Sequence, residues 1–295
     1  SLRKPLFNTP KYIKSFDEDD KYLMLPRGLK EKVSEFFNVN AVKFNFLDKR
    51  NFQYIETKKV TFTLRPEQSD AIKEIKKTDF SICVAPPGFG KTLLGAKIFE
   101  QRTCTTMIVV NKNMLLNQWI ERFVNYFGYD KKDIGYLGKG HNKLNGIIDV
   151  ATMQSLKNAP EIINNYSFVI VDECHHIPAI TFEQIIKNFK GKYILGLSAT
   201  PNRKDDLQPI LYQQLGEISY EYKKKRTHTN KLQIIRTDFE SSADNYSTII
   251  NELCLDENRN NLIIQAIKTN IQRKILVLTD RIEHINILEN LLQKD

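Results

Sequence analysis

The sequence predicts an α/β fold: a parallel β-sheet with helices on both faces. Short, nearly continuous apolar runs of strand length alternate with segments of helical spacing, as expected when both faces of a sheet are covered. The runs lie at residues 80–84, 107–110, 147–151, 168–171 and 193–197. Ligands of such sheets bind at the carboxyl ends of the strands, where the unusual polar residues of this chain also stand.

A different pattern fills residues 1–60 and predicts a small α+β accessory domain. A short strand at 21–25 is followed by a turn and by helical spacing at 29–38. Apolar and polar residues alternate at 42–46 and at 52–54, which favours a β-hairpin. Aromatic side chains at alternating positions are more typical of a core than of a base-stacking platform.

The remaining segments predict one complete domain and the beginning of another. Residues 61–228 contain the alternating pattern and should form the first large domain, and residues 229–255 should form a linker. Residues 256–295 begin a second β-α series, in which an apolar run at 275–279 predicts a strand. Helical spacing precedes this run and follows it.

Composition is that of a globular chain with a basic surface. The 295 residues are 41% hydrophobic, and the net charge is +9 with a sequence pI near 9.2. A basic chain suits a polyanion such as nucleic acid, although an AT-rich genome that favours lysine gives the same charge. No apolar run is long enough for a membrane span, so we expect no membrane partner. The four cysteines show no metal-ligand spacing and predict reduced, intracellular thiols.

One glycine-rich segment has the context of a phosphate-binding loop. It lies between a predicted strand and a predicted helix and reads Ala85-Pro86-Pro87-Gly88-Phe89-Gly90-Lys91-Thr92. Glycines let backbone N–H groups point at phosphate oxygens, the helix start and Lys91 add positive charge, and Thr92 suits a magnesium ion. The general pattern has glycine where this chain has Ala85. The alternative, an ordinary Gly-Pro turn before a helix, is disfavoured by the flanking strand and helix.

An acidic pair supplies what such a loop needs for hydrolysis of a nucleoside triphosphate. Asp172 and Glu173 follow the apolar run at 168–171. Asp172 suits Mg²⁺, and Glu173 stands where it can polarise an attacking water. The alternative is an acidic pair at a helix start. His175 and His176 have no third ligand at metal-site spacing, so we expect no metal site there.

Four motifs together resemble the superfamily 2 helicases in order and spacing, over residues 60–295. They are Arg65-Pro66-Glu67-Gln68, Pro87-Gly88-Phe89-Gly90-Lys91-Thr92, Asp172-Glu173-Cys174-His175 and Ser198-Ala199-Thr200. This resemblance implies two tandem RecA-like domains, with ATP between them and nucleic acid across their top.

Further motifs resemble one viral branch of that superfamily. The branch contains phage branch-migration helicases of the UvsW type and poxvirus-type transcript-release helicases, which are relatives of XPB. The motifs are Asn111-Lys112, Leu115-Leu116-Asn117-Gln118-Trp119, His175-His176-Ile177-Pro178-Ala179, Gly196 to Asp205 and Thr279-Asp280-Arg281. A Pro-Thr pair that is widespread in the superfamily is replaced here by Asn111-Lys112.

The resemblance implies a role for each matching residue. Adenine is read by Gln68, with Arg65 nearby. Phosphates are held by Pro87, Gly88, Phe89, Gly90 and Lys91. Magnesium is held by Thr92 and Asp172, and Glu173 is the general base. The ATP state is coupled to nucleic-acid grip by His175, Ser198, Ala199 and Thr200. The nucleic-acid backbone is contacted by Lys112, Asn113, Thr152 and Gln154.

The implied function is that of an ATP- and Mg²⁺-dependent helicase or translocase, with DNA favoured over RNA as partner. Forked or branched DNA is one expected substrate, and recombination, repair or replication is the expected setting. The alternatives are an RNA-directed or transcript-release motor, an ATP-gated nucleic-acid-binding module, and a restriction-nuclease motor, for which no nuclease cluster is visible. A viral origin implies the host cytoplasm.

One family feature is missing from the sequence. The second domain of relatives carries arginine fingers, and the chain contains no Q-x-x-G-R-x-x-R pattern. We therefore expect this chain to bind ATP but to turn it over slowly, and to be the N-terminal portion of a longer enzyme.

Overall fold

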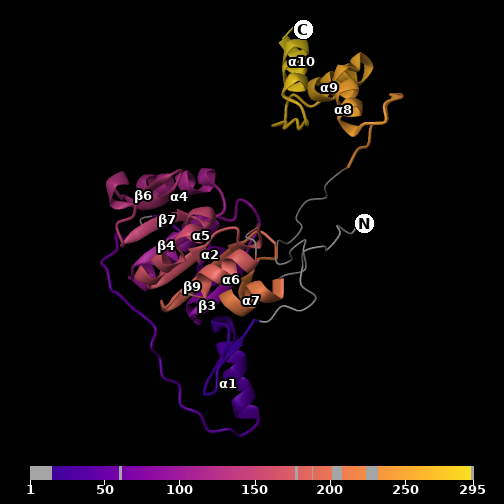
Figure 1. Ribbon diagram of the computed structural model, residues 1–295. Helices are drawn as coiled ribbons and strands as arrows, with labels where there is room; N and C mark the ends of the chain where they lie inside the picture. Colours follow the sequence, from indigo (N-terminus) through magenta and orange to yellow (C-terminus); the bar gives the residue numbers. More distant parts are fainter. Residues whose placement is uncertain are drawn as a thin grey trace. The chain divides into compact units, whose positions relative to one another are not determined.

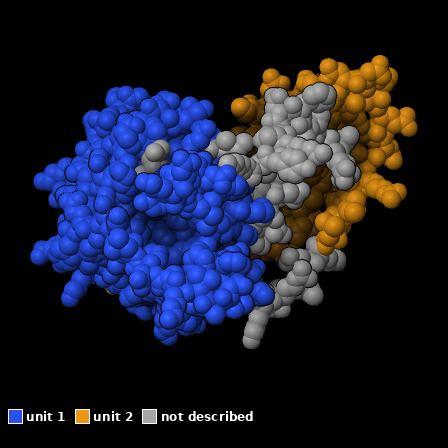
Figure 2. All heavy atoms as spheres, turned by 60° about the horizontal axis from the view of Figure 1, so that its bottom comes forward, with its two compact units in different colours: residues 1–224 blue, residues 225–295 orange. Residues whose placement is uncertain are grey.

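A computed structural model describes residues 15–59, 62–176, 179–187, 189–200, 208–223 and 232–293. Two compact units make up the chain, residues 1–224 and 225–295 (Figure 2). Two stretches that contributed to the resemblance, Ile177-Pro178 and 201–205, lie outside the described residues. No described helix combines the length and the apolar character needed to cross a membrane.

An eight-stranded sheet forms the centre of the first unit (Figure 1). Its spatial order is β10-β3-β9-β8-β4-β7-β5-β6, and every neighbouring pair is parallel except β5 with β6. The strands are β3 (Phe80–Val84), β4 (Thr106–Val110), β5 (Gly135–Gly138), β6 (His141–Lys143), β7 (Ile148–Thr152), β8 (Phe168–Val171), β9 (Tyr193–Ser198) and β10 (Ile218–Glu221). The predicted parallel sheet is confirmed, and β5, β6 and β10 are additions to it.

Helices cover both faces of this sheet, as predicted (Figure 1). One face packs against α2 (Pro66–Lys76), α3 (Lys91–Arg102) and α4 (Asn113–Phe127), and the other against α5 (Met153–Asn158), α6 (Ala179–Ile186) and α7 (Gln208–Leu215). Alternate residues of a strand serve the two cores: Cys83 lies in the first core, and Ile82 and Val84 lie in the second. Short 3-10 turns lie at Arg27–Leu29, Lys131–Asp133, Pro160–Asn165 and Cys174–His176.

Parallel strands bring their carboxyl ends to one edge of the sheet. Val84 of β3 is in register with Ser198 of β9, and Val110 of β4 is in register with Thr152 of β7. The segments that follow these strands and β8 carry the residues singled out from the sequence, so the topology gathers them along one edge.

The N-terminal stretch of the chain is grouped with the sheet in the first unit. It contains the short strands β1 (Asp17–Glu18) and β2 (Leu23–Met24) and the helix α1 (Lys30–Val39). The hairpin expected from 42–46 and 52–54 is wrong, because this part of the chain pairs with the sheet domain instead. Asn51 bridges to Gly191, and Tyr54 bridges to Cys104.

Aromatic residues of this stretch are exposed, so their expected place in a core is also wrong. Phe46 is 57% exposed and Tyr54 is 63% exposed, and α1 buries no residue. Their alternation with polar residues resembles that of a half-buried strand. Backbone and polar side-chain contacts also hold the stretch, as in the hydrogen bond from Gln53 N–H to Ser167 Oγ at 2.7 Å.

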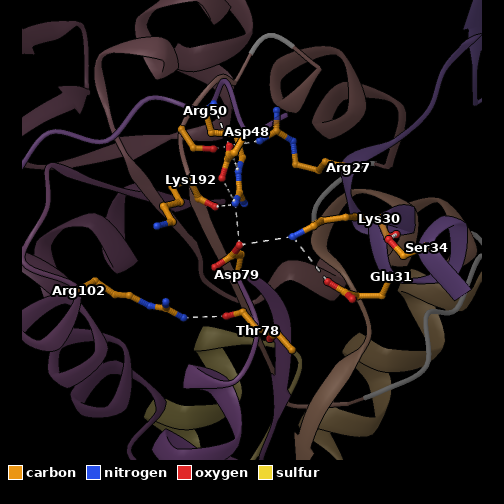
Figure 3. A network of polar contacts seen from close by, with 11 residues as sticks. Arg27, Lys30, Glu31, Ser34, Asp48, Arg50, Thr78, Asp79, Arg102 and Lys192 are labelled. Carbon is orange, nitrogen blue, oxygen red and sulfur yellow. Dashed lines mark hydrogen bonds and ion pairs between the residues drawn. The ribbon is translucent and has the colours of Figure 1, made fainter. Parts of the chain in front are cut away.

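A polar network fixes this stretch at the amino ends of β3 and β9 (Figure 3). The Arg50 guanidinium donates to Oδ2 of Asp79 at 2.8 Å and to the carbonyl oxygen of Lys192 at 3.0 Å. It also binds both carboxylate oxygens of Asp48, at 2.8 and 2.6 Å. Arg27 adds a second anchor, because its guanidinium lies 5.0 Å from the centre of the Phe189 ring.

The second unit contains α8 (Tyr246–Leu255), α9 (Glu257–Thr269) and α10 (Ile282–Gln293). The two helices predicted after residue 255 are therefore present, and α8 lies within the stretch expected to be a linker. No strand forms at 275–279, because the described residues of this unit provide no neighbouring strand. Buried His284 links two parts of this unit. Its Nδ1 lies 2.8 Å from Thr279 Oγ1, and its Nε2 lies 2.8 Å from Asn260 Oδ1.

Candidate nucleotide-binding site

The phosphate loop connects β3 to α3 and depends on two glycines. Gly88 has φ of 80° and Gly90 has φ of 89°, in the left-handed region that favours glycine. A Cβ on Gly90 would also lie 2.6 Å from Nε2 of Gln68. Ala85 is buried. Four of the described non-glycine residues have a positive φ, and Ala85 is not one of them. The alanine at this position is therefore compatible with the loop.

Lys91 begins α3 and turns its ammonium group into the loop. Its side chain is buried, and Nζ donates to the carbonyl oxygen of Ala85 at 3.0 Å. Nζ also lies 3.4 Å from Oε1 of Glu173. The charge is thus held between the loop and the acidic pair, where a phosphate would compete with the carboxylate for it.

Asp172 follows β8 and is 5% exposed. Its Oδ2 accepts a hydrogen bond from Nε1 of Trp119 at 2.8 Å, and its Oδ1 accepts one from the Glu173 N–H at 3.0 Å. Burial raises the pKa of the Asp172 carboxyl, and the Trp119 hydrogen bond and nearby Lys91 oppose that rise. A cation beside the carboxylate would favour its charged form further.

Glu173 occupies a strained backbone position next to Asp172. Its φ is 47°, which is uncommon for a residue with a Cβ, and such backbone positions cluster at functional sites. Its two carboxylate oxygens face different partners, Lys91 Nζ and His175 Nδ1, each at 3.4 Å. The carboxylate therefore stands between the phosphate loop and the histidine.

A hydrogen-bonded link runs from His175 to the Ser-Ala-Thr segment after β9. Ser198 Oγ lies 3.0 Å from His175 Nδ1 and accepts the N–H of Thr200 at 3.2 Å. The carbonyl oxygen of Ser198 accepts the N–H of Ala85 at 2.9 Å. The structure thus brings His175, Ser198 and Thr200 together with the phosphate loop, whereas Ala199 takes no part in these hydrogen bonds.

Gln68 stands at the start of α2 against the other side of the loop. Its side chain is buried, Nε2 donates to the carbonyl oxygen of Phe89 at 2.7 Å, and Oε1 accepts the Arg65 N–H at 2.9 Å. One N–H and one lone pair of the amide remain for a purine base. The Arg65 guanidinium lies 5.6 Å from the centre of the Phe89 ring.

A cavity of about 560 Å³ lies between the start of α2, the phosphate loop, α4 and the acidic pair, and its volume is within the usual range for small-molecule sites. Nine predicted site residues line it together with six that were not predicted as site residues: Thr63, Pro86, Leu93, Leu115, Gln118 and Arg122. Three of these six lie on α4 at helical spacing, which marks a common face but does not say what that face lines. Trp119 entered the sequence analysis only as the last residue of the motif Leu115 to Trp119, and its hydrogen bond to Asp172 was not predicted.

The donor groups fit a magnesium ion that is shared with a nucleotide. Thr92 and Asp172 both line the cavity and offer the oxygen ligands that Mg²⁺ prefers. The described part of the chain contains no group of three or more His, Cys, Asp or Glu residues that could hold a metal by itself. Phosphate oxygens and water would therefore complete the coordination.

The four candidate nucleic-acid residues stand at the carboxyl ends of β4 and β7. Lys112, Asn113 and Gln154 are exposed. Thr152 is buried, and its Oγ1 accepts the Ser155 N–H at 3.3 Å, so its hydroxyl caps α5. Three of the four side chains are thus accessible from outside, and Thr152 caps the helix that carries Gln154.

Comparisons with known proteins agree with this geometry. Residues 61–203 match a family model described as "Type III restriction enzyme, res subunit". The probable helicase D10 of Escherichia phage T5 is 27% identical over 267 residues, which are 88% of this chain and 58% of that protein. The DNA 3'-5' translocase XPB2 of Sulfurisphaera tokodaii is 35% identical over 182 residues, or 61% and 39% of the two chains. Over these matched residues the chain resembles the superfamily 2 helicases.

Solved structures show a RecA-like fold for this chain. A crystal structure of T4 UvsW has a TM-score of 0.57 at 17% identity, and the match covers 94% of this chain and 62% of that one. A second structure, of the UvsW helicase from bacteriophage T4, has a TM-score of 0.55 at 20% identity, and the match covers 68% of this chain and 80% of that one. The chain spans 39% of the length of XPB2 and 58% of the length of helicase D10.

Proposed function

We propose that this chain is an ATP-driven helicase or translocase that acts on DNA and remodels forked or branched structures. One observation carries the proposal. The phosphate loop, the Asp172–Glu173 pair and the Ser198–Thr200 segment meet at one edge of a single sheet, and exposed Lys112, Asn113 and Gln154 stand along the same edge. The residues for nucleotide chemistry and those for nucleic-acid contact therefore follow neighbouring strands of the same sheet.

The cavity residues supply what phosphoryl transfer to water requires. Backbone N–H groups of the loop and the Lys91 ammonium bind phosphate oxygens. Thr92 and Asp172 would hold Mg²⁺, which would neutralise charge on the phosphates. The Glu173 carboxylate orients the attacking water and accepts its proton.

The ion pair of Lys91 would change when a nucleotide binds. Its ammonium is paired with Glu173 Oε1 in the structure, and a terminal phosphate would take that ammonium over. Glu173 would then be free to engage water, and its contact with His175 would change. Because His175 also contacts Ser198, the change would reach the segment that follows β9.

The exposed side chains at the ends of β4 and β7 suit the sugar-phosphate backbone. A lysine and two amides can bind phosphate oxygens, and such contacts set position without reading sequence. The net charge of +9 supports a polyanionic partner. We therefore expect binding that weakens as salt rises and that depends little on base sequence.

The names of relatives support DNA but leave a second candidate. XPB2 is a DNA 3'-5' translocase by name, whereas a mimivirus protein that is 26% identical over 318 residues is a putative ATP-dependent RNA helicase. The alternatives to a DNA motor are thus an RNA-directed or transcript-release motor, and a module that binds nucleic acid under the control of ATP. Phage and virus relatives support a location in the host cytoplasm.

The decisive experiment compares ATP hydrolysis with a panel of nucleic acids at one fixed salt concentration. The panel holds single-stranded, duplex, forked and four-way DNA, and single-stranded RNA. A matched control, Glu161→Gln, changes an exposed carboxylate on the turn Pro160–Asn165, away from the cavity residues. Glu173→Gln should abolish stimulated hydrolysis, and Glu161→Gln should retain it.

Each result of the panel distinguishes one reading from the others. Strongest stimulation by forked or four-way DNA supports a branch-remodelling motor. Strongest stimulation by RNA supports the transcript-directed alternative. ATP binding without stimulation by any ligand contradicts a motor and leaves the ATP-gated module.

A further inference from the structure

Trp119 lies on the inner face of α4 and contacts the acidic pair. Its side chain is 1% exposed, and its Nε1 is 2.8 Å from Oδ2 of Asp172. The indole N–H can only donate a hydrogen bond, and it donates to a buried carboxylate oxygen of Asp172. Hydrogen bonds to charged groups are stronger than neutral ones, so this contact holds both partners firmly.

Packing leaves the indole little freedom to turn. Trp119 stacks on Phe123 one turn along α4, with ring centres 6.0 Å apart and planes at 29°. On another side α3 comes close, because a Cβ on Gly95 would lie 2.9 Å from Cη2 of Trp119. The absence of a side chain on Gly95 thus makes room for the indole between the two helices.

The two bonds to Asp172 together fix the plane of its carboxylate. Oδ2 is held by the indole, and Oδ1 is held by the backbone N–H of Glu173. Each oxygen keeps a lone pair for another partner. A carboxylate that cannot rotate presents those lone pairs in one direction, which is how groups behind a metal ligand set its geometry.

We propose that Trp119 is a positioning residue that orients Asp172 toward the magnesium–nucleotide complex. The inference rests on the proposed function, because it assumes that Asp172 serves bound Mg²⁺. Trp119 touches neither substrate nor metal and acts through Asp172. The next residue along α4, Gln118, lines the nucleotide cavity, as does Arg122, so this helix forms part of the site itself.

A purely structural role for Trp119 makes a different prediction. A core tryptophan contributes packing, and its loss would lower stability without changing how nucleotide binding depends on Mg²⁺. If Trp119 positions Asp172, its loss should instead change how nucleotide binding depends on Mg²⁺. Nucleotide affinity without Mg²⁺ should stay as it is, and the part of the affinity that Mg²⁺ adds should fall.

The test is equilibrium binding of N-methylanthraniloyl ADP to the full chain, titrated with Mg²⁺. Trp119→Phe keeps the aromatic bulk and removes the N–H. We expect it to raise the Mg²⁺ concentration for half-saturation roughly 10- to 100-fold, the usual effect of removing a group behind a metal ligand. Phe127→Leu is the matched control. It removes a buried aromatic ring from the same helix, one turn beyond the ring that stacks on the indole, and it should lower the melting temperature but leave the Mg²⁺ dependence unchanged.

The wild-type chain gives a second reading that does not depend on any variant folding. Trp119 is the only tryptophan, so tryptophan emission reports on the surroundings of this one indole, which include its bond to Asp172. With unlabelled ADP present, addition of Mg²⁺ should change that emission, and it should not do so in Asp172→Asn.

Two outcomes would overturn the inference. One is a Trp119→Phe variant that binds Mg²⁺ and nucleotide as the wild type does. The other is a wild type that binds both without any change in Trp119 emission. A wild type that binds no nucleotide at all contradicts the proposed function itself, which keeps the two failures distinct.

Discussion

At the scale of single residues, backbone conformation decides which positions of the site accept a side chain. Gly90 combines a left-handed φ of 89° with a neighbour, Gln68, that already occupies the space of a Cβ. Ala85 has no such conflict. Glu173 is the reverse case, because a residue with a long side chain stands at φ 47° while its carboxylate contacts Lys91 and His175. Such uncommon backbone positions cluster at functional sites, which agrees with the role proposed for Glu173.

Gly90→Ala should weaken nucleotide binding. The left-handed conformation costs an alanine about 1–2 kcal/mol, and the new Cβ would push the Gln68 amide away from Phe89. We expect ATP affinity to fall about tenfold or more, measured by titration calorimetry. Gly140→Ala is the control, since Gly140 has a φ of 76° but nothing within 4 Å of its Cβ position. Equal loss of ATP affinity in both variants would contradict this account.

At the scale of elements, α4 connects regions that the sequence presents as unrelated. The helix starts beside Lys112 and Asn113, carries Trp119 to Asp172, and turns Gln118 and Arg122 into the cavity. The sequence predicted this helix and the phosphate loop, because both follow local rules of spacing and glycine placement. The sequence did not predict that α4 lines the cavity or contacts Asp172. Both features depend on residues that are far apart in the chain, such as Trp119 and Asp172.

The same distinction explains the errors at the N-terminal stretch and at 275–279. Alternating apolar residues at 42–54 suited a local hairpin, but Asn51 and Tyr54 bridge to the distant Gly191 and Cys104. Residues 275–279 have the composition of a strand but no neighbouring strand among the described residues of their unit. An alternating pattern indicates that a segment is extended, but only the tertiary structure determines which segment it pairs with.

Arg50 makes the N-terminal stretch part of the stability of the first unit. Arg50→Ala removes the bonds to Asp79 and to the carbonyl of Lys192, in a place where the arginine side chain is 17% exposed. Hydrogen bonds of charged groups contribute about 1.5–3 kcal/mol each in mutational series, so we expect a loss of about 2 kcal/mol in unfolding free energy at pH 7. Urea unfolding, followed through Trp119 emission, measures it. Lys49→Ala, an exposed neighbouring cation, should change it little.

Acid should reduce the effect of Arg50→Ala. The Arg50 hydrogen bond lowers the pKa of the Asp48 carboxyl in the folded state. A carboxyl with a lowered folded pKa stabilises the fold above its unfolded pKa, about 3.9, and that contribution is lost as the pH falls further. The difference between wild type and Arg50→Ala should therefore shrink below about pH 4. A difference that stays constant from pH 7 to pH 3 would contradict the role of the Asp48 pair.

At the scale of the whole molecule, the central claim is that one edge of one sheet combines ATP hydrolysis with nucleic-acid contact. The two units are each organised around their own contacts, and the site residues described here all belong to the first. Its parallel sheet, covered on both faces, has the architecture in which strand ends form ligand sites. The proposed motor function rests on that arrangement.

One measurement tests the claim most directly: equilibrium ATP binding and single-turnover hydrolysis in the same samples, with Mg²⁺ and DNA, for wild type, Lys91→Ala and Glu173→Gln. The account predicts that Lys91→Ala loses binding, because its ammonium is the buried cation of the loop. Glu173→Gln should bind ATP as the wild type does and hydrolyse it about 10²- to 10⁴-fold more slowly, the usual contribution of a general base. Hydrolysis by Glu173→Gln at the wild-type rate, or ATP binding that survives in Lys91→Ala, would contradict it.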